Sequence, residues 1–375
     1  MKKFISVNQT KFFSSEKIKL NDCLKSGWIS SNGKYVVEFE KKISNSFHRK
    51  YSTTVVNGSA ALDVAIRALN IKKGDEVIMP TFSIISILLE VLRIGAKPIF
   101  IDSDLYTWNM RVEDIEKNIT KKTKAIIVVH IYGLPVDLDP VLKVAKKYNL
   151  KVIEDAAELI GQTYKGKPCG SFGDVSTFSF YANKHITTGE GGALLTNNKT
   201  LDKKFRLLRN LCFEKKRFVH REIGWNLRMT NLQASIGSAQ LDSLKKIVFL
   251  KRKIGAAYNE NLKTITDFIQ LPIEKTQYAD NIYWVYGIVV KKKYGISAQS
   301  LMNYLKKKRI ETRPFFFPLH QQPIVKKFFG KSNKSFPNSE SISKYGLYLP
   351  SGLGIKKKEI EYISKTLINF FKKKI

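Results

Sequence analysis

One lysine in this sequence lies where a reactive amine would be expected. Residues 175–181 form an apolar, β-branched run that predicts a buried strand, and residues 193–196 predict a second strand. Lys184 lies in the polar segment between them, and the glycine-rich stretch 189–192 leaves room for a large group. Burial favours the neutral amine of a lysine, and nucleophilic lysines are found in such places. Lys184 is therefore our candidate for the chemistry.

A carboxylate at the end of another expected strand is the second candidate. Asp155 follows the apolar residues Val152 and Ile153, and ligands of open α/β sheets bind at the carboxyl ends of the strands. Asp155 could instead cap the next helix. It could also bind magnesium in a nucleotide hydrolase, but the near-match to a phosphate loop at 161–168 has Pro168 where a hydroxyl is required. We reject the hydrolase interpretation.

The third signal is the junction of a strand and an amphipathic helix at residues 57–61. Gly58 allows close approach of a ligand to the backbone, and the free N–H groups at a helix start favour an anion. Ser59 could also be an ordinary helix cap. A lysine that can form an imine, a carboxylate for a pyridine nitrogen and a phosphate-binding helix start are together what pyridoxal 5′-phosphate (PLP) requires.

An alternation of strands and helices must position these residues. It predicts the α/β class, with a mostly parallel sheet covered on both faces. The expected strands are 53–56, 76–79, 97–101, 125–130 and 151–153, and the expected helices are 15–24, 36–43, 59–69, 83–92, 139–148 and 201–211. A long helix at 231–262 leads to a smaller α/β unit with strands 283–290 and 310–313 and helices 297–307 and 357–371.

The length of 375 residues suggests more than one domain. We expect an N-terminal arm with an active-site loop (1–50), a large PLP-binding domain (51–245), and a bridging helix with a small C-terminal α/β domain (246–375). No secretory signal or membrane-spanning run is expected, and three scattered cysteines without metal-ligand spacing favour a reduced, cytoplasmic setting without a bound metal.

The net charge of +33 could indicate a partner with negative charge. The lysines are spread along the whole chain and no nucleic-acid motif accompanies them, so we expect neither nucleic acid nor membrane as a partner. A non-catalytic regulator or nucleic-acid binder remains a remote alternative that rests on charge alone.

Several segments resemble the DegT/DnrJ/EryC1/StrS family of nucleotide-sugar aminotransferases. They are EDAAE at 154–158, TFSF at 177–180 with Asn183 and Lys184, ITTGEGG at 186–192, GWNLRMTN at 224–231, and RP at 313–314 with PLH at 318–320. The residues W-I-S-S at 28–31 with Gly33, V-E-F-E at 37–40 and Glu158 most resemble the GDP-perosamine synthase branch.

This resemblance implies the fold type I of PLP-dependent aminotransferases, which is aspartate aminotransferase-like. Lys184 would carry the cofactor as a Schiff base and then move protons, Asp155 would pair with the pyridinium nitrogen, and Glu158 would lie near the phenolic oxygen. The implied phosphate-binding residues are Gly58, Ser59, Ala60 and Ser179, with Asn226 from a second subunit. The implied contacts to the sugar nucleotide are Trp28, Ile29, Ser30 and His320.

The activity implied is transfer of the amino group of L-glutamate to C4 of a nucleotide-linked 4-keto-6-deoxy sugar, with pyridoxamine 5′-phosphate as the intermediate cofactor form. GDP-4-keto-6-deoxymannose is the expected substrate, and a homodimer with active sites at the subunit interface is the expected assembly. The same chemistry on a UDP- or dTDP-linked sugar, or at C3, is the alternative.

The chain departs from the family pattern at three positions. Ile84 stands where an aromatic ring often stacks on the cofactor, so either an apolar contact replaces stacking or Phe82 compensates. Leu227 replaces a usual tyrosine, and Phe317 stands where near relatives have histidine or tyrosine. These departures bear on the sugar rather than on the cofactor chemistry.

Overall fold

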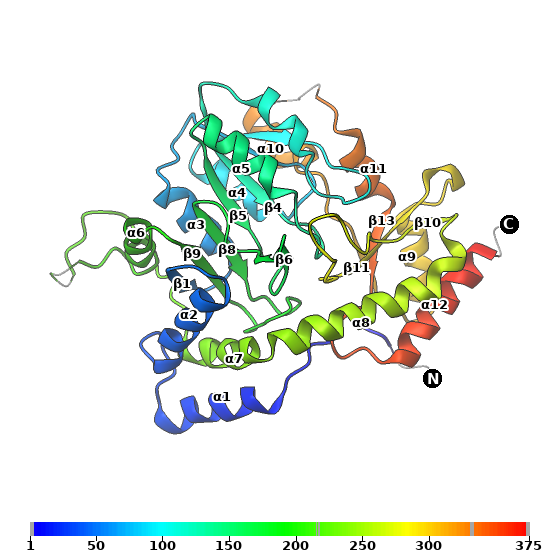
Figure 1. Ribbon diagram of the computed structural model, residues 1–375, viewed down its shortest axis with the longest axis horizontal. Helices are drawn as coiled ribbons and strands as arrows, with labels where there is room; N and C mark the ends of the chain where they lie inside the picture. The colour runs from blue at the N-terminus through cyan, green and yellow to red at the C-terminus, as the bar shows by residue number, and fades with distance from the viewer. Residues whose placement is uncertain (1–3, 215, 217, 331–333, 373–375) are drawn as a thin grey trace.

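A seven-stranded sheet forms the larger part of the molecule (Figure 1). The computed structural model describes residues 4–214, 216, 218–330 and 334–372. The start of the first expected domain range (1–3) and the end of the last (373–375) therefore lie outside the described residues. The strand order is β1-β9-β8-β5-β4-β2-β3. The strands are β1 (Tyr51–Val55), β2 (Glu76–Pro80), β3 (Lys97–Ile101), β4 (Thr123–Val129), β5 (Lys151–Asp155), β8 (Val175–Ser179) and β9 (Gly192–Thr196).

The sheet is mixed but mostly parallel, as expected. Strands β3, β2, β4, β5 and β8 pair in parallel, whereas β9 is antiparallel to both of its neighbours. Parallel pairing places the carboxyl ends of the central strands at one edge of the sheet, where Asp155 pairs with Val129 on one side and Thr177 on the other. This is the edge at which open α/β sheets bind ligands.

Helices cover both faces of this sheet. The helices along this part of the chain are α1 (Ser14–Ser26), α2 (Lys34–Ser46), α3 (Gly58–Ala68), α4 (Ser86–Arg93), α5 (Leu138–Lys147), α6 (Lys199–Arg209) and α7 (Asn231–Asp242). Ile127 and Val129 of β4 lie in the core shared with α3 and α4, whereas Ile126 and Val128 lie in the core shared with α2 and α5. Because successive strand side chains point to opposite faces, a strand buried on both faces is apolar throughout.

The helix predicted at 231–262 is in fact two helices, so that prediction was wrong. α7 begins with a capping box between Thr230 and Gln233 and ends at Asp242, because the next residue, Ser243, has a φ of −95° and a ψ of 5°, outside the helical region. α8 (Leu244–Leu262) then runs from the large sheet to a second, smaller sheet (Figure 1). The expected domain boundary at residue 245 falls at the start of α8, and the division into domains stays a prediction.

The smaller sheet has four strands in the order β10-β11-β13-β12, and all its pairs are antiparallel. Its strands are β10 (Ile269–Gln270), β11 (Tyr286–Val290), β12 (Arg313–Pro314) and β13 (Gly346–Leu349). The helices of this part are α9 (Ala298–Lys307), α10 (Pro323–Phe329), α11 (Pro337–Tyr345) and α12 (Lys357–Lys372). The predictions did not include β10, β13, α10 or α11.

Two predicted strands of this part are shorter than expected. The strand predicted at 283–290 begins only at Tyr286, because Tyr283 has a φ of +50°, which extended backbone does not allow. Of the strand predicted at 310–313, only Arg313 pairs with β13, since Ile310 instead forms a parallel bridge with Ile5.

Residues 5–10 form an extended segment, here called the N-terminal strap, which connects the smaller sheet to the loop after β8. Ile5 bridges to Ile310, and the carbonyl of Val7 accepts a hydrogen bond from the Ser351 N–H. Further along the strap, the Asn8 Nδ2 and Thr10 Oγ1 atoms both donate to the carbonyl of Ala182, at 3.1 Å each. The strap therefore holds the loop that carries Lys184.

Two further findings concern the segment that resembles a phosphate loop and the length and polarity of the helices. The segment that resembles a phosphate loop forms a small hairpin of β6 (Thr163–Tyr164) and β7 (Lys167–Pro168) instead of a loop between a strand and a helix. Within the described parts of the chain, the helices are too short or too polar to cross a membrane.

Candidate active site

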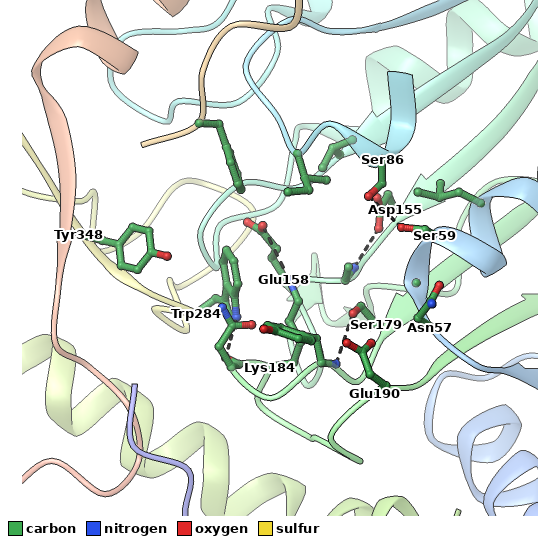
Figure 2. Close-up of a pocket in the computed structure, with 18 residues that line it drawn as sticks. Asn57, Ser59, Ser86, Asp155, Glu158, Ser179, Lys184, Glu190, Trp284 and Tyr348 are labelled. Atoms are coloured by element: carbon green, nitrogen blue, oxygen red, sulfur yellow. Dashed lines mark hydrogen bonds and ion pairs between the residues drawn. The ribbon is translucent and has the colours of Figure 1, made fainter. Parts of the chain in front are cut away.

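A cavity of about 420 Å³ opens at the carboxyl edge of the large sheet, facing the smaller sheet (Figure 2). Six of the residues predicted from the sequence line it: Gly58, Ser59, Asp155, Glu158, Ser179 and Lys184. They come from the start of α3, the end of β5, the turn that follows it, the end of β8 and the loop between β8 and β9. The fold thus brings together the three signals that motivated the cofactor hypothesis.

Lys184 projects into this cavity from the loop between β8 and β9. Its backbone N–H donates to the Tyr181 carbonyl, which keeps the loop tight. Its Nζ lies 3.9 Å from Oε1 of Glu158 and 3.7 Å from the centre of the Trp284 ring. Burial lowers the pKa of Lys184, while the nearby Glu158 and Asp155 carboxyl groups oppose that shift. A buried lysine with a lowered pKa has more of the neutral, nucleophilic amine.

Two adjacent acids at the end of β5 have different roles because they point to opposite faces of the sheet. Glu154 accepts hydrogen bonds from the Gly170 N–H, the Phe172 N–H and the Ser176 hydroxyl, so it belongs to the framework. Asp155 lines the cavity, and its Oδ1 accepts one hydrogen bond from the Ala157 N–H. Burial raises the pKa of Asp155. A cationic ring nitrogen in the cavity would favour the ionised carboxylate.

Glu158 is almost completely buried beside Lys184. Its Oε2 accepts a hydrogen bond of 2.8 Å from the Tyr132 N–H. Burial raises the pKa of Glu158 to about 8, with the Lys184 charge opposing the shift. The 3.9 Å separation is too long for a hydrogen bond. We therefore place the proton on Glu158 at neutral pH, where the carboxyl can donate a hydrogen bond to an oxygen in the cavity.

The start of α3 provides the expected anion site. Asn57, and not Ser59, caps the helix, since its side chain accepts from the Ala60 N–H at 2.8 Å. The N–H groups of the first helical residues, Gly58 and Ser59, have no partner within the helix. A Cβ atom on Gly58 would lie 2.8 Å from the Cβ atom of Ser179, so only glycine fits here. Ala60 lies in the same turn, although it is not among the described residues that line the cavity.

Several residues that line the cavity were missed by the sequence analysis. Ser86 accepts a hydrogen bond of 2.9 Å from the Ser59 hydroxyl, and Trp284 and Tyr348 face the cavity from the smaller sheet (Figure 2). Tyr181 and Phe316 also line it. Ser86 could have been suspected as the first residue of a helix. The others carry no local signal, because their position depends on how the two sheets pack together.

Five other predicted residues lie away from this cavity in the single chain. Trp28 and Ile29 are 61% and 47% exposed, and Ser30 lines a second cavity beside three arginines. Asn226 pairs through its backbone with Asn210. His320 shares hydrogen bonds with the Thr81 hydroxyl and Glu340. None of the five is among the described residues that line the first cavity.

The structure places Ile84 and Phe82 differently relative to the cavity. Ile84 lines the cavity, whereas Phe82 is fully buried in a cluster with Tyr132, Phe315 and Phe316. Ile84 is therefore placed to offer an apolar contact to a group in the cavity, whereas Phe82 does not line it. Of the other departures, Leu227 packs against the core and Phe317 is 53% exposed.

Comparison with known proteins places the chain among aminotransferases. The profile of the DegT/DnrJ/EryC1/StrS aminotransferase family matches residues 13–368. A GDP-perosamine synthase of Escherichia coli O157:H7 is 42% identical over 373 residues, which cover 99% of this chain and 100% of the relative.

Two solved structures show the same fold. A GDP-4-keto-6-deoxymannose-3-dehydratase mutant with bound GDP-perosamine has a TM-score of 0.89 at 25% identity, covering 97% of this chain and 100% of that one. PseC of Helicobacter pylori, an aminotransferase involved in pseudoaminic acid biosynthesis, has a TM-score of 0.93 at 23% identity, covering 99% and 100%. The expected fold type I is thereby confirmed.

Proposed function

This chain belongs to the DegT/DnrJ/EryC1/StrS aminotransferase family, and on that premise we propose that it makes GDP-perosamine. It would transfer the amino group of L-glutamate to C4 of GDP-4-keto-6-deoxymannose, releasing 2-oxoglutarate. The observation that carries the proposal is the cavity in which the Lys184 amine, the Asp155 carboxyl and the start of α3 converge. The 42% identity to a GDP-perosamine synthase supports the choice of substrate.

The residues of the cavity fit PLP. When bound, PLP supplies an aldehyde that takes up an amino group and a pyridine ring that withdraws electrons from the reacting carbon. The start of α3, with Ser59, Ser179 and Ser86, offers N–H and hydroxyl donors for the phosphate. Gly58 leaves the backbone open to close approach. The buried Asp155 and Glu158 carboxyl groups, which line the same cavity as Lys184, suit the ring nitrogen and the phenolic oxygen.

Each residue has a defined task in this proposal. Lys184 would hold the cofactor covalently, and its released amine would move a proton to and from the substrate carbon. Asp155, as a carboxylate, would keep a proton on the ring nitrogen and so maintain the ring as an electron acceptor. Glu158, as a neutral carboxyl, would donate a hydrogen bond to the phenolic oxygen. Burial supports these tasks, because hydrogen bonds and charges act more strongly where water is excluded.

We also propose that the enzyme is a homodimer with shared active sites. Trp28 and Ile29 are exposed apolar residues, and Asn226 and Ser30 lie away from the cavity of their own chain. In a dimer, Asn226 would reach the phosphate in the partner's cavity, and the loop with Trp28, Ile29 and Ser30 would contact its nucleotide sugar. His320 remains a proposed substrate contact. A cytoplasmic setting is proposed because the three cysteines are free and buried.

Mixing two inactive variants tests the shared sites. A Lys184→Ala subunit lacks the amine, and an Asn226→Ala subunit lacks the proposed contact to the partner's phosphate. Mixed dimers should contain one site that is intact on both sides, so activity should exceed that of either variant alone. Equal activity before and after subunit exchange would contradict shared sites.

Purified enzyme with PLP, L-glutamate and GDP-4-keto-6-deoxymannose tests the function itself. We expect formation of GDP-perosamine and 2-oxoglutarate, detected by mass spectrometry. Lys184→Ala should abolish turnover, whereas Lys165→Ala, a change at an exposed lysine paired with Asp139, should leave it unchanged. A panel of UDP- and dTDP-linked 4-keto and 3-keto sugars tests the choice of substrate. Faster turnover of one of these sugars would show that it, and not GDP-4-keto-6-deoxymannose, is the substrate.

A further inference from the structure

Trp284 contacts the Lys184 loop in two ways. Its ring centre lies 3.7 Å from Lys184 Nζ, and its indole N–H donates a hydrogen bond of 3.0 Å to the carbonyl of Asn183 (Figure 2). Trp284 is 6% exposed and lies just before β11 of the smaller sheet. A side chain one hundred positions away in sequence thus touches both the amine and the backbone of the loop that carries it.

The smaller sheet holds Trp284 firmly in turn. The buried Lys251 on α8 donates from its Nζ to the carbonyls of Trp284 at 2.9 Å and Ser351 at 2.6 Å. The hydroxyl of Ser351 accepts from the Tyr286 N–H in β11. The Trp284 ring also lies 5.9 Å from the Tyr132 ring, between ring centres. Because both ends of Trp284 are fixed, its ring offers a rigid surface to the amine.

An aromatic face attracts a cation, and most strongly where water is excluded. The other titratable groups around Lys184 are Glu158 and Asp155 from the end of β5 and its following turn, Glu190 and Tyr181 from its own loop, and Tyr348 from β13. His185 follows Lys184 directly. Of these groups, Glu158 is 3.9 Å from the Nζ. The Trp284 ring is therefore a close partner that stays in place whatever the protonation state of the carboxyl groups.

We infer that Trp284 is a positioning residue for Lys184: its ring holds the amine while the amine is not linked to the cofactor, and its N–H fixes the loop at Asn183. This assignment rests on the proposed function, in which Lys184 must be released and recaptured in each reaction cycle. The ring keeps the released amine beside the reacting carbon rather than free to rotate away. No bond is formed or broken by Trp284 itself.

Covalent capture of PLP by the apoenzyme tests the inference without turnover. Apoenzyme is mixed with PLP from about pH 6 to about pH 10, the product is fixed with borohydride, and the modified Lys184 peptide is measured by mass spectrometry. Only the neutral amine attacks the aldehyde. Since the ring stabilises the ammonium form, Trp284→Leu should lower the pH midpoint of capture by about one unit. Its turnover should fall by about tenfold, because the amine and its loop are held less well.

Two further variants make the result specific. Trp284→Phe keeps an aromatic face but loses the N–H, so its midpoint should fall by about half as much as that of Trp284→Leu. Tyr283→Phe changes the neighbouring residue, whose hydroxyl accepts from Asn259, and should retain the wild-type midpoint. If Trp284→Leu does not fold, the Trp284→Phe midpoint decides, and a wild-type value overturns the inference.

The inference and the proposed function fail in different ways. Wild-type apoenzyme that does not capture PLP on Lys184 overturns the proposed function and, with it, the role of Trp284. Wild-type capture with an unchanged midpoint in Trp284→Leu leaves the proposed function intact and overturns the inference alone. Equal shifts of the pH midpoint in Tyr283→Phe and Trp284→Leu also overturn the inference, because they would indicate that any change near residues 283–284 loosens this part of the chain.

Discussion

Glu158 Oε1 lies 3.9 Å from Lys184 Nζ, and both side chains are largely buried. Burial raises the pKa of Glu158 to about 8 from an ordinary value of 4.5. The folded chain therefore keeps a proton that the unfolded chain releases near pH 4.5. The stability that this proton provides is fully present below about pH 4.5 and is lost as the pH rises to about 8.

Glu158→Gln should remove this dependence, because a glutamine side chain is neutral at every pH. We expect the apoenzyme variant to become more stable relative to wild type as the pH rises from about 4.5 to about 8, by roughly 1–3 kcal/mol. Urea unfolding at several pH values measures the difference. Glu260→Gln, at an exposed position on α8 paired with Lys263, is the control and should show no such trend. A constant difference across this range would falsify the assignment of the proton to Glu158.

His185 should produce a pH dependence of opposite sign. Its Nδ1 shares a hydrogen bond with the Ile160 carbonyl, and burial, with the charge of Lys251 adding to it, lowers its pKa to about 3 from 6.5. The stability provided by the neutral ring is present above pH 6.5 and is lost as the pH falls toward 3. His185→Gln should therefore lose less stability than wild type between about pH 7 and about pH 5, by up to roughly 1–2 kcal/mol.

The comparison at His185 uses slopes and not absolute stabilities. Glutamine keeps a hydrogen-bond donor but changes the packing, so the variant is expected to be less stable than wild type at every pH. Urea midpoints of both apoenzymes, measured across the acid range, give the two slopes. Parallel slopes would show that folding does not lower the pKa of His185.

Gly58→Ala should weaken binding of the phosphate specifically. The new Cβ atom would meet the Ser179 Cβ atom at 2.8 Å and displace either the start of α3 or the end of β8. Capture of PLP by the apoenzyme should need about tenfold more cofactor, because anion contacts at the helix start are lost. Pyridoxal, which lacks the phosphate, serves as the matched control. An equal loss for both compounds would place the damage at Lys184 instead.

Asp155→Asn should separate catalysis from stability. Asparagine retains the shape but cannot keep a proton on the ring nitrogen, so turnover should fall by about 100-fold or more while the fold survives. The adjacent Glu154→Gln should do the opposite. It places an amide donor among four donors, the fourth being the His130 ring, and should cost about 1–3 kcal/mol of stability while Lys184 still captures PLP. Steady-state kinetics and urea unfolding of both variants measure the two effects. A larger loss of stability in Asp155→Asn and a larger loss of turnover in Glu154→Gln would contradict the prediction.

The sequence predicted what lies at the ends of continuous strands and missed what depends on packing between distant segments. Asp155 and Lys184 were found because apolar runs end beside them, and parallel strands share one carboxyl edge. Trp284 was not found, because nothing near residue 284 indicates that the smaller sheet packs against this edge. The break at Ser243 was missed because residues 239–246 contain no proline or glycine that would mark the end of a helix.

The contacts of the N-terminal strap allow us to predict when, during folding, the loop that carries Lys184 is completed. Asn8 and Thr10 donate hydrogen bonds to the carbonyl of Ala182, and Trp284 donates one to that of Asn183. Segments at least 101 residues apart in sequence therefore meet at one loop. Contacts between such distant segments form late, because closing long loops costs entropy. Covalent capture of PLP during refolding should therefore lag behind the recovery of helical circular dichroism. Capture of the cofactor would then show that the N-terminal strap, the large sheet and the smaller sheet have all assembled.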